Sequence, residues 1–420
     1  MSLWRNPEFL KLWVGQTISE IGSRVTTYGL PLMAVTTLRA TPSQMGMLSA
    51  AGGFAAIIAS PFAGLAADRF RRKPVLWITD LARAAILFVI PLSAWQGWIS
   101  LPVLFAVMAA ASCFTVFFDA AYQSILPSMV GGRQLLEGNS KLAMTQSGAE
   151  VIGPALAGVL VQLYTAPRAI LLDSLSFLVS AASILWMRVP ESKPVSASEP
   201  SEGWKEMFSG IPYIFRHPIL RPLALRAITA YFCFGSFVSL YFIFTVHDLG
   251  LSAAAIGVII SLGGVSNLFG ATVSGYVANR FPVGLTLIGS TIFTGLQLLL
   301  VPLANGPFWA PVLLSASQLV GDLAFPIYQV TELTVRQRVA DPALLGRVNA
   351  FMQMLAKGVL PAGALAGGYA ASLMGVRMTL VLADCGIVLS ALWLLFSDVK
   401  KMTSMRPARE LAPISPREGL

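Results

Sequence analysis

The residues of this 420-residue chain that could do chemistry are charged side chains set inside long apolar stretches. Glu20 and Arg24 lie four residues apart, so a helix would place them one turn apart on one face. A carboxyl group whose cationic partner can move away is able to exchange a proton during a conformational change. The same two residues could instead form a permanent ion pair that holds the helix in place. Asp322 and Glu150 are further proton-carrying candidates within apolar stretches.

The elements that must position these residues are membrane-spanning helices. Hydrophobic residues make up 55% of the chain and charged residues only 12%, about half the charged fraction of soluble domains. A bilayer-spanning helix needs about 20 mostly apolar residues. The prediction is weakest for the first span, because that segment contains several polar residues. We therefore expect an all-α membrane protein whose twelve helices cover residues 12–38, 43–67, 75–95, 99–125, 140–163, 167–187, 222–246, 253–278, 284–304, 308–332, 347–371 and 376–397.

The distribution of cations indicates how these helices are oriented. Of the 29 lysines and arginines, only Arg39, Arg168 and Arg377 fall in the turns on one side, while nearly all others fall on the side of the termini. Because Lys and Arg concentrate in cytoplasmic loops, we expect both termini in the cytoplasm and the protein in the inner or plasma membrane. The net charge of +9 is thus explained by topology, and we expect no nucleic-acid partner.

An internal repeat relates the two halves of the chain. Asp173 and Gly153 recur as Asp384 and Gly363. A longer ungapped match, with one constant separation, consists of the pairs Gly46/Gly257, Gly52/Gly263, Gly53/Gly264, Gly64/Gly275, Arg69/Arg280 and Phe70/Phe281. Two such halves imply a binding site between them that is reached alternately from each side of the membrane.

A composition break separates these halves. Residues 189–203 are rich in Pro, Ser and Glu, which is typical of a flexible linker, and the apolar residues that follow recur at helical spacing. We expect four regions: a six-helix bundle over residues 1–188, a cytoplasmic linker with a short amphipathic helix over 189–221, a second bundle over 222–397 and a disordered cytoplasmic tail over 398–420.

Two short motifs resemble those of the major facilitator superfamily of transporters. The stretch GLAADRFRRKP is similar to the family's loop between the second and third helices, with Gly64, Asp68, Arg69, Arg72 and Lys73 at matching positions and Arg71 in place of a glycine. The stretch GPALAG, with Gly153, Pro154 and Gly158, is similar to the motif of antiporters that export drugs. Residues 117–130 and 170–181 resemble the macrolide-efflux and siderophore (enterobactin)-exporter branch.

The resemblance implies roles for these motifs. It implies that Asp68 helps to close a cytoplasmic gate, and we expect Gly64 to let two helices approach closely there. The cations of the loop could instead serve only to keep it in the cytoplasm. Gly153 and Pro154 would permit a bend in the fifth helix, although small residues there could also serve only helix packing. An arginine that many of the superfamily's exporters carry in the fourth helix is absent from residues 101–125, so a coupling scheme based on it does not transfer.

The pair Glu20 and Arg24 has no counterpart in the second half, where Tyr231 and Gly235 occupy the equivalent positions. We expect such asymmetric residues to serve the substrate or the coupling ion. Small-molecule sites are mostly apolar with a few polar anchors. The candidates for lining the substrate cavity are Tyr28, Tyr122, Gln123, Tyr231, Gln329 and Gln353.

These observations predict a secondary transporter that exports an amphipathic small molecule in exchange for protons. The sequence contains no phosphate-binding GxxxxGK[ST] loop and no grouping of histidines and cysteines, so we expect no enzyme activity, cofactor or metal. We expect a monomer in the lipid bilayer. Uptake of a small metabolite, facilitated or proton-coupled, is the alternative within the same class. A membrane receptor or enzyme that does not transport is the alternative outside it.

Overall fold

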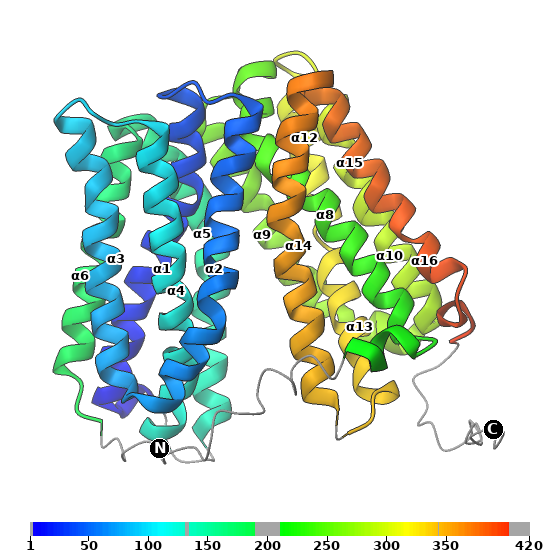
Figure 1. Ribbon diagram of the computed structural model, residues 1–420, viewed down its shortest axis with the longest axis horizontal. Coiled ribbons are helices and arrows are strands. Elements are labelled where there is room, and N and C mark those ends of the chain that lie inside the picture. The colour runs from blue at the N-terminus through cyan, green and yellow to red at the C-terminus, as the bar shows by residue number, and fades with distance from the viewer. Residues whose placement is uncertain (1–2, 131–133, 190–210, 343, 403–420) are drawn as a thin grey trace.

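A computed structural model describes residues 3–130, 134–189, 211–342 and 344–402, and these residues are almost entirely helical (Figure 1). The first half contains α1 (Pro7–Thr36), α2 (Pro42–Arg69), α3 (Arg72–Trp95), α4 (Leu101–Met129), α5 (Leu135–Tyr164) and α6 (Ala166–Trp186). The second half contains α8 (Leu220–Ile243), α9 (Ala253–Arg280), α10 (Val283–Leu298), α11 (Leu300–Leu303), α12 (Trp309–Gly321), α13 (Ala324–Val339), α14 (Leu345–Met374), α15 (Val376–Ser390) and α16 (Leu392–Leu395).

These helices form the twelve predicted spans. Ten helical segments of the described chain are long and apolar enough to cross a membrane by composition alone. The other two spans are α1, whose polar residues made it the weakest prediction, and α14. The predicted fold class, an all-α membrane protein with two six-helix bundles, is confirmed.

Interruptions within four spans were not predicted. The ninth, tenth and twelfth spans are each divided in two, as α10–α11, α12–α13 and α15–α16, and the seventh ends in the π-helical turn Phe244–Asp248. In the tenth span, α12 ends at Gly321 and α13 begins at Ala324. A Cβ atom on Gly321 would lie 2.0 Å from the Cδ atom of Gln297, so the glycine gives this amide room to pack against the break.

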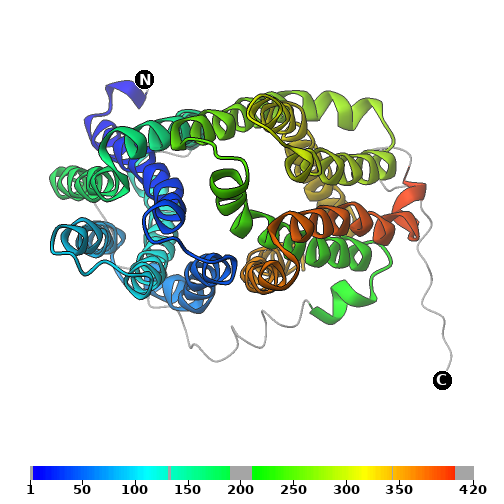
Figure 2. The same cartoon turned by 90° about the horizontal axis from the view of Figure 1, so that it is seen from above.

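The two halves stand side by side. The helices from α1 to α6, blue to green in Figure 1, pack mainly on one another on one side of the molecule, and those from α8 to α16 pack together on the other. Figure 2 shows the same separation from above. Contact between the halves runs mainly along two seams, α2 against α14 and α5 against α9.

Repeated glycines lie at the tightest points of both seams. A Cβ atom on Gly46 would lie 2.5 Å from the backbone oxygen of Ala364, and one on Gly257 would lie 2.3 Å from that of Pro154. Two turns further along α2, Gly53 meets the ring of Pro361 in the same way. The halves are therefore in close contact toward the face opposite the chain termini.

The halves part toward the face that carries the termini. A Cβ atom on Gly64 or on its repeat Gly275 would have no neighbour within 4 Å, and the same holds for Gly148 and Gly358 farther up the seams. The expectation that Gly64 mediates a close helix approach is thus wrong for this conformation, because the ends of α2 and α14 do not meet here. The arrangement is open to the face of the termini.

The predicted linker and tail lie largely outside the described residues, which omit 190–210 and 403–420. Residues 211–216 are helical, and Ile211, Ile214 and Phe215 pack against the second bundle. Residues 398–402, which we expected to begin a disordered tail, instead include a 3₁₀ turn at Asp398–Lys401. Val399 is fully buried there and packs with the second bundle, which explains the order.

Candidate functional site

A cavity of about 490 Å³ lies between the two halves. The first half contributes residues of α1 and α5, and the second half contributes the rest. Its walls combine aromatic and aliphatic side chains with charged and amide groups, which suits a molecule with both apolar and polar parts. The lining residues are Arg24, Tyr28, Glu150, Arg226, Ala230, Tyr231, Phe234, Ile260, Gly263, Gly264, Asn267, Thr294, Gln297, Leu298, Gln318, Asp322, Phe325 and Ile387.

Three charged side chains meet where the first half borders the cavity, and two of them, Arg24 and Glu150, line it. The Nη2 atom of Arg24 lies 2.9 Å from Oε1 of Glu20 and 3.4 Å from Oε1 of Glu150. Glu20 and Arg24 are one turn apart on α1, as the spacing predicts, whereas Glu150 comes from α5. The structure thus joins two of the acids proposed as proton carriers through one arginine.

All three charged side chains are partly buried. The exposed fraction is 21% for Arg24, 35% for Glu20 and 36% for Glu150. Attraction between charges is stronger at such partly buried positions than in bulk water. The arrangement can hold two negative charges against one positive charge, so that a proton on either acid would balance the group.

Asp322 approaches the same cavity from the second half. It lies at the break between α12 and α13, and a Cβ atom on Gly263 of α9 would lie 2.2 Å from its Oδ2 atom. No ion pair or hydrogen bond to its carboxylate occurs among the residues that the structure describes. Asp322 is therefore available to a cationic group or a proton that enters the cavity.

The antiporter-like motif packs α5 against one helix of each half. A Cβ atom on Gly153 would lie 2.4 Å from Cβ of Arg24, and one on Gly158 would lie 2.3 Å from the backbone oxygen of Ala253. Pro154 is accommodated within the continuous helix α5 and contacts Gly257 across the seam. The motif therefore packs against α1 at one glycine and against α9 at the other.

Five of the six substrate candidates from the sequence line smaller pockets. Tyr122 and Gln123 line a pocket of about 230 Å³ in the first half, together with Glu20. Tyr231, Gln329 and Gln353 line a pocket of about 90 Å³ in the second half. Of the candidates, only Tyr28 and Tyr231 reach the central cavity.

The loop motif lies at the face of the termini, where the halves are parted. Asp68 and Arg69 are exposed, and Asp68 forms no ion pair or hydrogen bond within the described ranges. Arg72 is half-buried. Lys73 has a structural role, since its Nζ atom donates to the backbone oxygens of Leu185 (3.0 Å) and Met187 (2.6 Å) at the end of α6. This cation stabilises a helix C-terminus rather than serving only as a topological signal.

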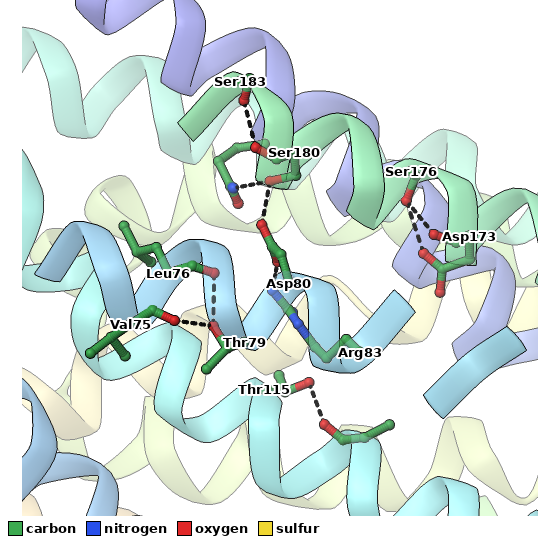
Figure 3. Close-up of polar contacts among 12 residues, drawn as sticks. Val75, Leu76, Thr79, Asp80, Arg83, Thr115, Asp173, Ser176, Ser180 and Ser183 are labelled. Carbon is green, nitrogen blue, oxygen red and sulfur yellow. Dashed lines mark hydrogen bonds and ion pairs between the residues drawn. The ribbon is translucent and has the colours of Figure 1, made fainter. Parts of the chain in front are cut away.

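A second polar group is sealed inside the first bundle (Figure 3). Asp80 and Arg83, three residues apart on α3, form a buried ion pair, and Ser180 donates to Oδ2 of Asp80 at 2.6 Å. The Arg83 guanidinium also lies 4.1 Å from the ring centre of Phe118 and 4.2 Å from that of Phe177. Every partner belongs to the same bundle and none lines the central cavity, so this group holds the bundle together.

The repeated aspartates differ in their surroundings. Asp173 accepts a hydrogen bond from Thr26. It accepts another from Ser176 at 3.1 Å (Figure 3). Its repeat Asp384 is fully buried, and neither carboxylate oxygen has a hydrogen-bond partner within the part of the chain that the structure covers. The equivalents of Thr26 and Ser176 are Phe237 and Ile387, which cannot donate. The two aspartates therefore do not share one structural role.

Sequence reasoning missed Arg226 and Asn267, both of which line the central cavity. The distribution of charges in the sequence assigns Arg226 to the cations of the cytoplasmic side. It is instead buried, with its guanidinium 3.7 Å from the ring centre of Tyr328 and its Nε atom 3.2 Å from Oγ1 of Thr291. Its position inside an apolar helix was the available signal. For amides within apolar helices, the sequence offers no signal that distinguishes a residue lining the cavity from one that only packs between helices.

The fold and the cavity together define a polytopic membrane transporter with a site between two related halves. Residues 12–362 match the family model described as Major Facilitator Superfamily, so the chain belongs to the major facilitator superfamily, as the loop motif indicated.

Curated relatives and solved structures agree with this membership. The chain is 24% identical to "Multidrug efflux pump Tap" of Mycobacterium tuberculosis, over 92% of each chain. It is 22% identical to "Macrolide efflux protein A" of Streptococcus pyogenes, over 92% of this chain and 94% of the relative. A crystal structure of the nucleoside transporter NupG matches with a TM-score of 0.73 at 14% identity, over 92% of this chain and 98% of that one. This last likeness shows the fold alone.

Proposed function

We propose that the protein exports an amphipathic small molecule across the cell membrane in exchange for protons, by alternating access. The observation that carries the proposal is the group Glu20–Arg24–Glu150, of which Arg24 and Glu150 line the cavity between the halves. An arginine shared by two acids can release one of them when the halves move, and the released acid can then take up a proton. Substrate and proton would thus compete through one set of side chains.

The chemistry of the cavity supports an amphipathic cargo. Tyr28, Tyr231, Phe234 and Phe325 offer aromatic surface, while Asp322 is an acid with no cationic partner among the described residues. A lipophilic molecule that is neutral or carries one positive charge fits this lining better than a strongly anionic molecule. The efflux pumps among the relatives support export over uptake.

The charge distribution supports the orientation. In the sequence, most of the 29 lysines and arginines fall in segments on the side of the termini, which favours a cytoplasmic position for that side and for both termini. The cavity would then open to the cytoplasm in this conformation, where an exporter loads its cargo. The domain limits and the monomeric state stay predictions.

A transport assay with the purified protein tests the proposal. In proteoliposomes loaded with a labelled lipophilic cation, a pH gradient should drive movement of the wild-type cargo, whereas Glu20→Gln should abolish that drive. Counterflow, in which unlabelled cargo exchanges for labelled cargo at equal pH, should persist in Glu20→Gln because it needs no proton.

The matched control is Glu137→Gln, since Glu137 lies near the face of the termini and pairs with Lys141 instead (3.1 Å). Gradient-driven flux in Glu20→Gln at the wild-type rate would contradict the role of Glu20. Wild-type protein that shows counterflow but no response to the gradient would contradict proton coupling itself and would favour facilitated transport.

A further inference from the structure

Gly153 lies where the side chain of Arg24 crosses from α1 to α5. A Cβ atom at position 153 would have Arg24 atoms as its three nearest neighbours: Cβ at 2.4 Å, Cγ at 2.7 Å and Cδ at 3.8 Å. The first two distances are too short for any real carbon contact. Glycine therefore leaves the space that the aliphatic stem of Arg24 occupies.

The equivalent crossing in the second half is built differently. There α8 and α14 are in backbone contact, because a Cβ atom on Gly235 would lie 2.1 Å from the oxygen of Leu360 and one on Gly363 would lie 1.9 Å from that of Phe232. Gly235 is the repeat of Arg24 and Gly363 is the repeat of Gly153. In the second half, Gly235 and Gly363 thus put a glycine on both helices. In the first half, Arg24 faces Gly153, so only α5 has a glycine at the crossing.

We propose that Gly153 is a positioning residue that seats the stem of Arg24 so that its guanidinium reaches Glu20 and Glu150 together. Glu150 lies one turn before Gly153 on α5. How closely the Arg24 stem approaches α5 at Gly153 therefore determines the distance between the Arg24 guanidinium and Glu150. The antiporter-like motif then acts through Arg24, and a bend at Pro154 is not required for that action.

The consequence for coupling rests on the proposed function. Whichever acid loses contact with Arg24 is the one that accepts a proton more readily. An alanine at position 153 must push aside either the Arg24 stem or α5, and both movements change the balance between Glu20 and Glu150. Gly153 therefore controls the pH dependence of transport without touching substrate.

A double-mutant cycle on stability tests the seat independently of transport. Gly153→Ala should lower the thermal midpoint of the detergent-solubilised protein by at least about 3 °C, because overpacking is destabilising. In an Arg24→Gly background, which reproduces the residue of the second half, the same alanine should cost little, since the stem is gone. An equal loss in both backgrounds would overturn the proposal and would indicate a backbone role for Gly153.

Gly158→Ala is the matched control, because its Cβ would meet the backbone oxygen of Ala253 and not Arg24. Its effect on the midpoint should be the same with and without Arg24→Gly. In proteoliposomes, Gly153→Ala should shift the midpoint of the pH profile of transport by about one unit, as expected when a neighbouring charge moves. An unchanged profile would overturn the coupling role. Failure of the proposed function would show differently, as a wild-type protein without any response to pH.

Discussion

At the scale of single residues, the cavity has charged side chains with partners and one acid, Asp322, that has none among the described residues. Arg24 lies between Glu20 and Glu150, and Arg226 lies against the ring of Tyr328. Asp322, in contrast, faces the cavity from the break between α12 and α13 without an ion-pair partner in the described ranges. An acid in this position has a strong electrostatic preference for a cation over a neutral group. The preference makes Asp322 the natural contact for a charged cargo.

We predict that Asp322→Asn weakens binding of a lipophilic monocation about tenfold or more, since hydrogen bonds to charged groups contribute about 1.5–3 kcal/mol. Binding of a neutral analogue of the same shape should change less than about twofold. Fluorescence or calorimetric titration of the purified protein with both compounds measures the difference. Equal losses for the two compounds would show that Asp322 supports the shape of the cavity and not the charge of the cargo.

At the scale of elements, helix ends at the face of the termini are held by specific side chains. At the C-terminal end of α6, Lys73 donates to the backbone oxygens of Leu185 and Met187. Lys11 donates to that of Trp186. The start of α8 is held by His217, whose Nδ1 atom accepts from the backbone nitrogens of Ile219 (3.1 Å) and Leu220 (3.3 Å). This contact needs the neutral imidazole, and burial lowers the pKa of His217, which favours that form.

We predict that His217→Ala lowers stability by about 1 kcal/mol at pH 8, the usual effect of losing an N-terminal cap. The folded-state pKa is below the unfolded value of about 6.5, so the contribution of His217 is present above that pH and is lost as the pH falls. The difference in stability between wild type and mutant should therefore shrink as the pH falls below about 6.5. Thermal unfolding of both proteins across this range is the measurement, and a constant difference between them would contradict the cap.

At the scale of the whole molecule, the structure matches one of the two conformations that the proposed alternating access requires. Both seams are tight at Gly46 and Gly257 and open at Gly64 and Gly275. Gly53 on α2 packs on Pro361 of α14. About three turns closer to the face of the termini, α2 reaches Gly64 and α14 reaches Ala350. Both residues are exposed on the parted ends of α2 and α14. Closing this face would bring them together.

We predict that cysteines at Gly64 and Ala350, in a protein with Cys113, Cys233 and Cys385 replaced by serine, form a disulfide only in the closed state. The bond should block transport, and a reductant should restore it. A cysteine pair at Gly64 and Ala356 is the control, because Ala356 lines a pocket within the second bundle. If the first pair formed no bond under any condition of turnover, the seams would not close in this register.

The sequence by itself determined the features that depend on composition and local spacing. The twelve spans follow from the length of apolar runs, and the two halves follow from the repeated glycines. The pairs Glu20–Arg24 and Asp80–Arg83 were predictable because residues three or four apart on a helix must lie on one face. The family was predictable from the loop motif.

Only the tertiary structure decided which residues from different helices meet. Glu150 reaches Arg24 because α1 and α5 cross at Gly153, and no spacing in the sequence encodes that crossing. The isolation of Asp322, the burial of Arg226 and the open end at Gly64 depend in the same way on how whole helices pack. Helix formation is local, whereas a site between two bundles is a property of their arrangement.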